Sequence, residues 1–293
     1  MSLRDEYEAY AASRAALTKD PYGPVWLNQE QRYVHPFRIY GNVWYVGDNW
    51  VCVHLIDTGE GLLLIDSGNC GATAMLVQAI WEAGFDPADV KWIIHSHGHL
   101  DHIGGANFFK RMYGTELYLG APDARMFRER PWISAIQDAH STLETLFTPD
   151  HEITDGEVLR FGGTEVACYL VPGHTDGCVA LFFDARDGGE AKRCGYYGGF
   201  GFNTLQKEYL IEIGDPEYKV RKTYLHSLAR VRDQRVDIFL GNHCNNNDTL
   251  GRRKRQLEDP DGPNPFVDDQ AWGEYLDRKR DELLEFMSNP ANI

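Results

Sequence analysis

Alternating apolar and polar positions dominate the chain from about residue 30 onward, a pattern that is typical of short strands. Segments rich in β-branched and aromatic residues predict antiparallel strands at 36–40, 42–46 and 51–56. A hairpin turn at 57–61 (DTGEG) then leads into the apolar run LLLID. The globular region is therefore expected to begin as an antiparallel meander.

Helical spacing of apolar residues follows this meander. Residues 71–84 and 106–114 carry such a period, and each ends at a glycine, which commonly follows the last turn of a helix. Between them, KWIIH at 91–95 predicts a strand. Strands and helices thus alternate in this part of the chain.

The second half of the chain also predicts both strands and helices. Residues 153–199 are β-rich, 216–233 have a helical period, 236–240 predict a buried strand, and 268–287 predict a terminal amphipathic helix. The polar segment 245–265 is expected to be an extended surface loop. Two β-rich halves, each with helices, predict an α+β protein built as a four-layer αβ/βα sandwich, with helices on both outer sides.

The first thirty residues indicate a charged, helix-prone segment followed by the turn-rich connector DPYGPVWLNQE. We therefore expect a helical extension over 1–30 and one domain over 31–293 that includes the terminal helix. The N-terminus lacks the apolar core of a secretion signal, although a native leader could have been removed before it. No stretch reaches the roughly 20 apolar residues of a membrane span, so no membrane association is expected.

Composition favours a globular protein in a reducing compartment. With 43% hydrophobic and 25% charged residues, the chain can bury a large core. Its six cysteines include no C-x-x-C pair, which favours reduced thiols and a cytoplasmic location. The net charge of -15 argues against nucleic acid as a partner and leaves a small-molecule substrate, while the sequence predicts no oligomeric state.

The candidate chemistry lies in the run HSHGHLDHIGG at 95–105. Four ligand-type residues fall within six positions after a predicted strand: His97, His99, Asp101 and His102. The alternating histidines can point the same way, while the other two residues begin the next helix and aim at an adjacent point. This density predicts two neighbouring metal pockets. The glycines at 104 and 105 allow the helix to pack closely on the strand ends.

The pattern H-x-H-x-D-H followed by Gly-Gly resembles the signature of the metallo-β-lactamase superfamily. Three other marks of that family have counterparts here in the right order: Asp66 at the end of an early strand, His174 in a PGHT turn, and His243 after the last strand. Together they span most of the chain. The stretches YGNVWYVG and LIDTGEGLLLIDSG resemble the B3 subclass in particular. The resemblance therefore implies the metallo-β-lactamase fold.

The resemblance also implies two zinc ions (Zn2+) per chain, each with three protein ligands and an open position for water. The first ion would be held by His97, His99 and His174. The second would be held by Asp101, His102 and His243. Asp66 would orient the histidine loop by hydrogen bonds, with a simple turn role as its alternative. Of the remaining histidines, which are interpreted as structural, His54 and His95 are expected to lie nearest the metals.

A mechanism follows from the charge of such ions. Two cations about 3.5–4 Å apart would share a water, lower its pKa and polarise the scissile bond. The metal-bound hydroxide would be the nucleophile, and Asp101 is the catalytic candidate that orients it or carries its proton to the leaving group. Cys244, beside His243, is interpreted as a packed loop residue rather than a ligand.

The stretch AKRCGYYGGFGFN at 191–203 departs from the family pattern. It has no acidic residue where glyoxalase II-like and lactonase-like enzymes place a bridging aspartate, and glycines where B3 enzymes typically place serines. Its aromatic residues are interpreted as core. The leading hypothesis is a dinuclear zinc hydrolase of B3 β-lactamase-like architecture acting on a small cyclic amide or ester. A thioester, lactone or phosphoester hydrolase is the alternative, and an iron-dependent redox enzyme is a third reading.

Overall fold

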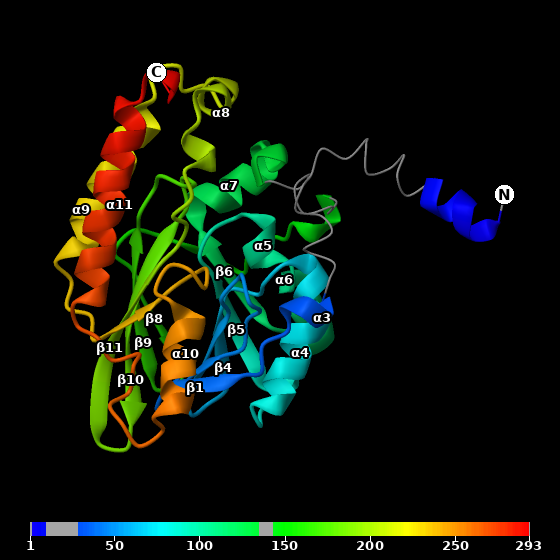
Figure 1. Ribbon diagram of the computed structural model, residues 1–293, viewed down its shortest axis with the longest axis vertical. Helices are drawn as coiled ribbons and strands as arrows, with labels where there is room; N and C mark the ends of the chain where they lie inside the picture. Colours follow the sequence, from blue (N-terminus) through cyan, green and yellow to red (C-terminus); the bar gives the residue numbers. More distant parts are fainter. Residues whose placement is uncertain (1, 10–28, 135–142, 293) are drawn as a thin grey trace.

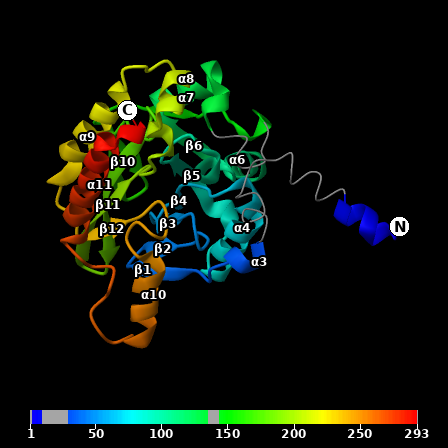
Figure 2. The same cartoon turned by 45° about the horizontal axis from the view of Figure 1, so that its top comes forward.

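Two β-sheets pack face to face in the structure, a computed structural model that describes residues 2–9, 29–134 and 143–292. Helices α9 (Lys219–Arg232) and α11 (Ala271–Ser288) cover the outer face of one sheet, and α4 (Thr73–Glu82) and α6 (Ala106–Tyr113) cover that of the other (Figures 1 and 2). The predicted four-layer α+β sandwich is confirmed.

The first sheet contains seven strands in sequence order. They are β1 (Phe37–Tyr40), β2 (Val43–Tyr45), β3 (His54–Asp57), β4 (Leu62–Ile65), β5 (Val90–His95), β6 (Glu116–Gly120) and β7 (His151–Ile153). Strands β1 to β4 pair antiparallel, and β4 to β7 pair parallel. Parallel neighbours end at the same edge of a sheet, so the segments after β4, β5 and β6 lie close together there.

The second sheet contains five strands. They are β8 (Val158–Phe161), β9 (Thr164–Leu170), β10 (Val179–Asp187), β11 (Glu190–Tyr197) and β12 (Ile238–Leu240), in the order β12-β11-β10-β9-β8. All pairs are antiparallel except β11 with β12. Between the sheets, Ile65 and Ile94 join Leu181 and Phe183 in one buried cluster. Burying each such side chain stabilises the fold by about 1.5–3 kcal/mol.

The remaining elements connect the strands. The other α-helices are α3 (Gln29–Arg32), α5 (Leu100–Ile103), α7 (Ala121–Glu129), α8 (Lys207–Glu212) and α10 (Thr249–Glu258). Short 3-10 turns are η1 (Cys70–Ala72), η2 (Pro87–Asp89), η3 (Pro131–Ser134), η4 (Leu143–Thr145), η5 (Asn203–Leu205) and η6 (Pro290–Asn292). The glycines expected to end α4 and α6, Gly84 and Gly114, both have positive φ, as a left-handed helix cap requires.

The segment 245–265 differs from the predicted loop because α10 lies within it. This helix has no apolar period; it is rich in Arg, Lys, Gln and Glu, which favour helix by propensity alone. Arg252 anchors it by donating to the backbone oxygen of Asn247 (2.8 Å) and pairing with Asp268 (2.9 Å). Strand β6 and helix α7 were also not predicted. The strand expected at 51–56 begins only at His54.

Residues 3–9 are helical, whereas 10–28 lie outside the described residues. The division into an extension over 1–30 and a domain over 31–293 therefore stays a prediction. Within the described ranges, none of the helices combines the length and the apolar character that crossing a lipid bilayer requires.

Gly104 lies where the segment after the histidine cluster packs directly on main chain. A Cβ at this position would lie 1.9 Å from the backbone nitrogen of Cys70 and 2.2 Å from the carbonyl carbon of Asn69. Gly104→Ala must therefore separate two backbones, and we expect it to lower the free energy of unfolding by about 2–3 kcal/mol. Gly189→Ala is the control, because a Cβ there meets no atom within 4 Å. Urea titrations that give the two variants equal stability would contradict this packing.

Candidate metal centre

The six ligand-type residues predicted from the sequence come together at one edge of the sandwich. His97 and His99 lie on the loop after β5, and Asp101 and His102 on α5. His174 comes from the turn between β9 and β10, and His243 from the turn after β12. Three separate segments of the chain thus build one cluster, with four of its residues following a strand of the first sheet and two following strands of the second.

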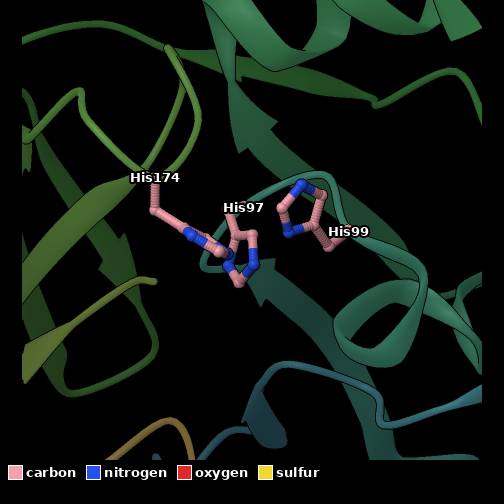
Figure 3. A group of neighbouring side chains, drawn as sticks. All are labelled: His97, His99 and His174. Atoms are coloured by element: carbon pink, nitrogen blue, oxygen red, sulfur yellow. The ribbon is translucent and has the colours of Figure 1, made fainter. Parts of the chain in front are cut away.

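Three imidazoles form the first group of the cluster, His97, His99 and His174, and we call it the first triad. One ring nitrogen from each lies within 4.8 Å of the others. Their ring centroids are 4.5 to 4.9 Å apart, and Figure 3 shows the two loop histidines and His174 converging on one region. All three side chains are buried.

Hydrogen bonds fix which nitrogen His97 and His174 present. Nδ1 of His174 donates to the carbonyl of Gly201 (2.9 Å), which leaves its Nε2 as an acceptor. Nδ1 of His97 pairs with the hydroxyl of Ser96 (2.9 Å), whereas its buried Nε2 finds no hydrogen-bond partner among the described residues. A buried polar atom without a partner is costly, so Nε2 of His97 is the atom placed to bind a ligand.

The second triad, Asp101, His102 and His243, is tighter. Nε2 of His102 lies 3.3 Å from Nε2 of His243 and 3.4 Å from Oδ2 of Asp101, and the third side of the triangle is 3.5 Å. Nδ1 of His102 donates to Asp66, and Nδ1 of His243 donates to the carbonyl of Trp50 (3.2 Å). Both Nε2 atoms therefore face a carboxylate oxygen, an arrangement that favours positive charge at its centre.

These distances allow a test of whether a metal fits. A tetrahedral zinc with bonds of about 2.0–2.1 Å separates its ligand atoms by about 3.3–3.4 Å. The three sides of the second triad are 3.3, 3.4 and 3.5 Å. The second triad fits this geometry with almost no rearrangement, and the first triad offers the unpartnered nitrogen of His97.

Burial sets the charge of most of these groups. It lowers the pKa of His99 and His243 to about 4 and holds the pKa values of His97 and His174 well below the ordinary range of an imidazole. Four imidazoles are therefore neutral at pH 7, the form that binds metals.

His102 is the exception. Burial lowers its pKa, but the carboxylates of Asp101 and Asp66 on either side outweigh this and raise it to about 10. For Asp101, burial raises the pKa, but the charges of His102 and His243 lower it by more. The pKa of the carboxyl therefore lies well below its usual range, and the group is ionised at neutral pH. The carboxylates of Asp101 and Asp66 thus make the second triad the part of the cluster that favours a positive charge.

Asp66 lies behind the second triad, fully buried at the end of β4. Its Oδ2 accepts hydrogen bonds from Nδ1 of His102 (2.7 Å), the hydroxyl of Tyr196 (2.6 Å) and the hydroxyl of Ser96 (2.9 Å). Its Oδ1 accepts from the backbone nitrogen of Ser96 (2.7 Å). The residue also has a φ of 65°, which is uncommon outside glycine. Through these bonds Asp66 fixes the ring of His102 and the first residue of the histidine loop.

Asp123, in the first turn of α7, was not predicted. Its carboxylate is fully buried and accepts from the backbone nitrogen of Gly98 (2.7 Å), the hydroxyl of Thr175 (2.7 Å) and the backbone nitrogen of Gly177 (2.8 Å). It therefore ties the loop of His97 and His99 to the turn of His174. Burial raises its pKa to about 6 even though these three bonds lower it. An aspartate at a helix start is an ordinary capping signal, which is why the sequence did not single it out.

The strand end at 196–199 explains the departure from the family pattern. A Cβ at Gly198 would lie 2.6 Å from the backbone oxygen of Ser96, and one at Gly199 would lie 2.5 Å from the ring of His174. Neither an aspartate nor a serine fits where β11 packs this closely on the ligand loops. The preceding Tyr196 and Tyr197 are fully buried, which confirms their interpretation as core.

Two further features adjoin the triads. Trp50 is 45% exposed, and its ring stands edge-on to that of His243 at 5.7 Å. A cavity of about 150 Å³ adjoins His174 and is lined by Met126, Arg130, Ile133 and Tyr209 among others. His54 and His95 are buried and bond the backbone oxygens of Gly241 (2.9 Å) and Tyr118 (3.2 Å), outside both triads.

Residues 51–188 match the family model described as the metallo-beta-lactamase superfamily. The chain is 28% identical to hydroxyacylglutathione hydrolase of Anaeromyxobacter dehalogenans, over 48% of this chain and 45% of that protein. It is 29% identical to hydroxyacylglutathione hydrolase GloC of Haemophilus influenzae, over 44% of this chain and 59% of that protein. The chain thus spans about half the length of the curated relatives it matches.

Similar solved structures cover much more of the chain. The FEZ-1 metallo-beta-lactamase of Legionella gormanii superposes with a TM-score of 0.78 at 28% identity, covering 88% of this chain and 97% of that one. BJP-1, a subclass B3 metallo-beta-lactamase of Bradyrhizobium japonicum, gives a TM-score of 0.78 at 24% identity, covering 89% and 96%. The predicted metallo-β-lactamase fold and the likeness to the B3 subclass are confirmed.

The two triads predict separable metal sites. His174→Ala removes a nitrogen of the first triad, and His243→Ala removes one of the second, so each variant should bind about one zinc where the unmodified chain binds about two. His226→Ala, on the exposed face of α9, is the matched control. Elemental analysis after gel filtration measures the ratio. Two zincs retained in both triad variants would count against this assignment.

Asp123→Asn tests the tie between the two ligand loops. An amide keeps only one acceptor oxygen, so its NH₂ group faces the donor of Gly177 or the donors of Gly98 and Thr175. Loss of a bond that orients ligands typically costs 10- to 100-fold in metal affinity, and we expect about that loss here. Competition with a chromophoric chelator measures the affinity. Asp89→Asn, at an exposed aspartate of η2, should leave it unchanged.

Proposed function

We propose that this chain, whose residues 51–188 match the metallo-beta-lactamase superfamily model, is a dinuclear zinc-dependent hydrolase acting on a small cyclic amide or ester. The observation that carries the proposal is the pair of adjacent triads, each with three ligand atoms. Three protein ligands is the number that catalytic zinc sites use while keeping a position for water.

The chemistry of the ligands favours zinc over iron. Five of the six ligands are imidazoles and one is a carboxylate. Imidazole suits zinc well, whereas a di-iron centre that activates oxygen would be expected to use more carboxylates. This argues for hydrolysis over the redox alternative.

The residues divide the work as follows. Bound zinc ions supply Lewis acidity, which lowers the pKa of a water and polarises the scissile carbonyl. The carboxylate of Asp101 is ionised at neutral pH and partly exposed, so it can accept a hydrogen bond from the attacking water and pass its proton to the leaving group. Asp66 and Asp123 hold the ligand loops in place through buried hydrogen bonds.

The proposed substrate class is supported by a similar solved structure and by the residues around the triads. Likeness to FEZ-1 over 88% of the chain supports a cyclic amide. The aromatic ring of Trp50 beside His243 offers an apolar contact, and the cavity beside His174 combines apolar side chains such as Ile133 with charged ones such as Arg130. Substrate sites are typically apolar with few polar anchors.

A thioester is the second candidate. It is favoured by the sequence likeness to two hydroxyacylglutathione hydrolases at 28% and 29% identity. Against it stands the glycine pair at the end of β11, which leaves no room for the bridging aspartate expected of that branch.

A substrate panel on the zinc-loaded chain separates these candidates. The panel contains a chromogenic cephalosporin, a set of lactones and a glutathione thioester, each assayed with the unmodified chain and with Asp101→Asn. We expect turnover of the cephalosporin or a lactone, reduced about 10²- to 10⁴-fold in kcat by the substitution. Asp89→Asn should keep full activity.

Either of two results would redirect the proposal. Turnover of the thioester alone would select the second candidate. Purification with one or two iron atoms per chain, and no hydrolysis of any member of the panel, would overturn the hydrolase assignment.

A further inference from the structure

Two cysteine thiols lie against each other directly behind the second triad. Sγ of Cys52 is 3.9 Å from Sγ of Cys244, and Cys244 is the residue after the ligand His243. The two segments are joined by an isolated antiparallel bridge between Val51 and His243. Backbone bonds on either side, from Cys52 to Asn242 (2.9 Å) and from Cys244 to Trp50 (3.0 Å), complete this connection.

We propose that Cys52 and Cys244 are a redox modification site, at which a reversible disulfide forms and displaces His243 from the second triad. Formation of the disulfide does not depend on the proposed function. Its consequence for activity rests on the proposed function, because only a metal-dependent enzyme would lose activity with the ligand.

The register of the bridge explains why the bond would move the backbone. Cys52 lies opposite Asn242, and Cys244 lies opposite Trp50, so the two cysteines are diagonal neighbours on one face. A disulfide needs its sulfurs about 2.05 Å apart and its Cβ atoms about 3.5–4.5 Å apart, closer than diagonal positions normally bring them. Closing the present 3.9 Å gap between the sulfurs therefore requires a shift of main chain.

The different burial of the two cysteines indicates which segment of main chain would shift. Cys52 is fully buried within the core between the sheets. Cys244 is only half-buried, in a turn at the margin of the site. The displacement therefore falls on Cys244 and on His243 beside it, whose Nε2 must stay within 3.3 and 3.5 Å of its partners to complete the triad.

The reaction balances with a hydroperoxide as the oxidant. The sulfur of Cys244 attacks one oxygen of hydrogen peroxide, the O–O bond breaks, and sulfenic acid and one water form. The sulfur of Cys52 then attacks that of Cys244, the S–O bond breaks, and the disulfide and a second water form. Two thiols are thus oxidised and one peroxide is reduced to two waters, and a dithiol reductant reverses the change.

The other cysteines supply internal controls. Cys168, Cys178 and Cys194 are fully buried, as Cys52 is, but unlike Cys52 none of them hydrogen-bonds a second sulfur in the described part of the chain. Cys70 is the other partly exposed cysteine and lies on η1. Cys70→Ser is therefore the matched control for the two variants at the thiol pair.

The test uses the zinc-loaded full chain, treated with hydrogen peroxide and digested without reduction. Mass spectrometry should find one peptide pair linked through Cys52 and Cys244, and elemental analysis should show loss of about one zinc per chain. Hydrolysis should fall at least about 10-fold, and dithiothreitol followed by zinc should restore it. Cys52→Ser and Cys244→Ser should keep their zinc after peroxide, whereas Cys70→Ser should respond as the unmodified chain does.

Three outcomes would overturn the proposal. The first is oxidation of Cys244 to sulfinic acid with no linked peptide. The second is a linked peptide with both zincs retained. The third is equal loss of zinc in Cys244→Ser. Peptide mapping of the unmodified chain needs neither a foldable variant nor a known substrate, so failure of the proposed function and failure of the thiol pair give different results.

Discussion

The buried carboxylate of Asp66 holds together elements from both sheets and the histidine loop. It stands at the end of β4 and accepts from Ser96 after β5, from His102 on α5 and from Tyr196 on β11. An ionised carboxylate in an apolar interior is costly unless its lone pairs are all used. Burial raises its pKa, yet the charge of His102 and these hydrogen bonds bring the pKa below its usual range. The carboxylate of Asp66 therefore stays ionised, and the surrounding residues must supply hydrogen-bond donors in fixed directions.

Asp123 applies the same constraint to the first triad. It joins Gly98, between two ligand histidines, to Thr175, beside the third. Each triad thus has its own buried carboxylate that connects the two sheets: Asp123 joins the loop of His97 and His99 to the turn of His174, and Asp66 joins His102 to Tyr196 of the second sheet. The distances between the ligand residues therefore depend on how the two sheets pack together. Neither loop can shift without losing hydrogen bonds to a buried carboxylate.

The sequence predicted the sandwich, most strands and four members of the triads for a physical reason, whereas His174 and His243 were predicted through the family resemblance. Four ligand residues stand in one short run whose geometry depends mainly on local backbone, and strand and helix periods around it are regular. Asp123 and the hydroxyl of Tyr196 could not be predicted in this way, since their contacts join residues more than fifty and one hundred positions apart. Helix α10 was missed because side-chain propensity and the contacts of Arg252 stabilise it, with no apolar stripe to mark it.

The same constraints locate where substrate choice must lie. In the proposed hydrolase, the triads and their carboxylates would fix the metal chemistry, which cyclic amides, lactones and thioesters can share. The end of β11 contributes only backbone here, because Gly198 and Gly199 pack on Ser96 and His174 without room for a side chain. In the proposed hydrolase, recognition would therefore come from other side chains, where Trp50 lies beside His243 and a cavity lies beside His174. Since Trp50 and Cys244 are joined by a backbone hydrogen bond, a shift at the thiol pair would alter a ligand and a wall of the substrate site together.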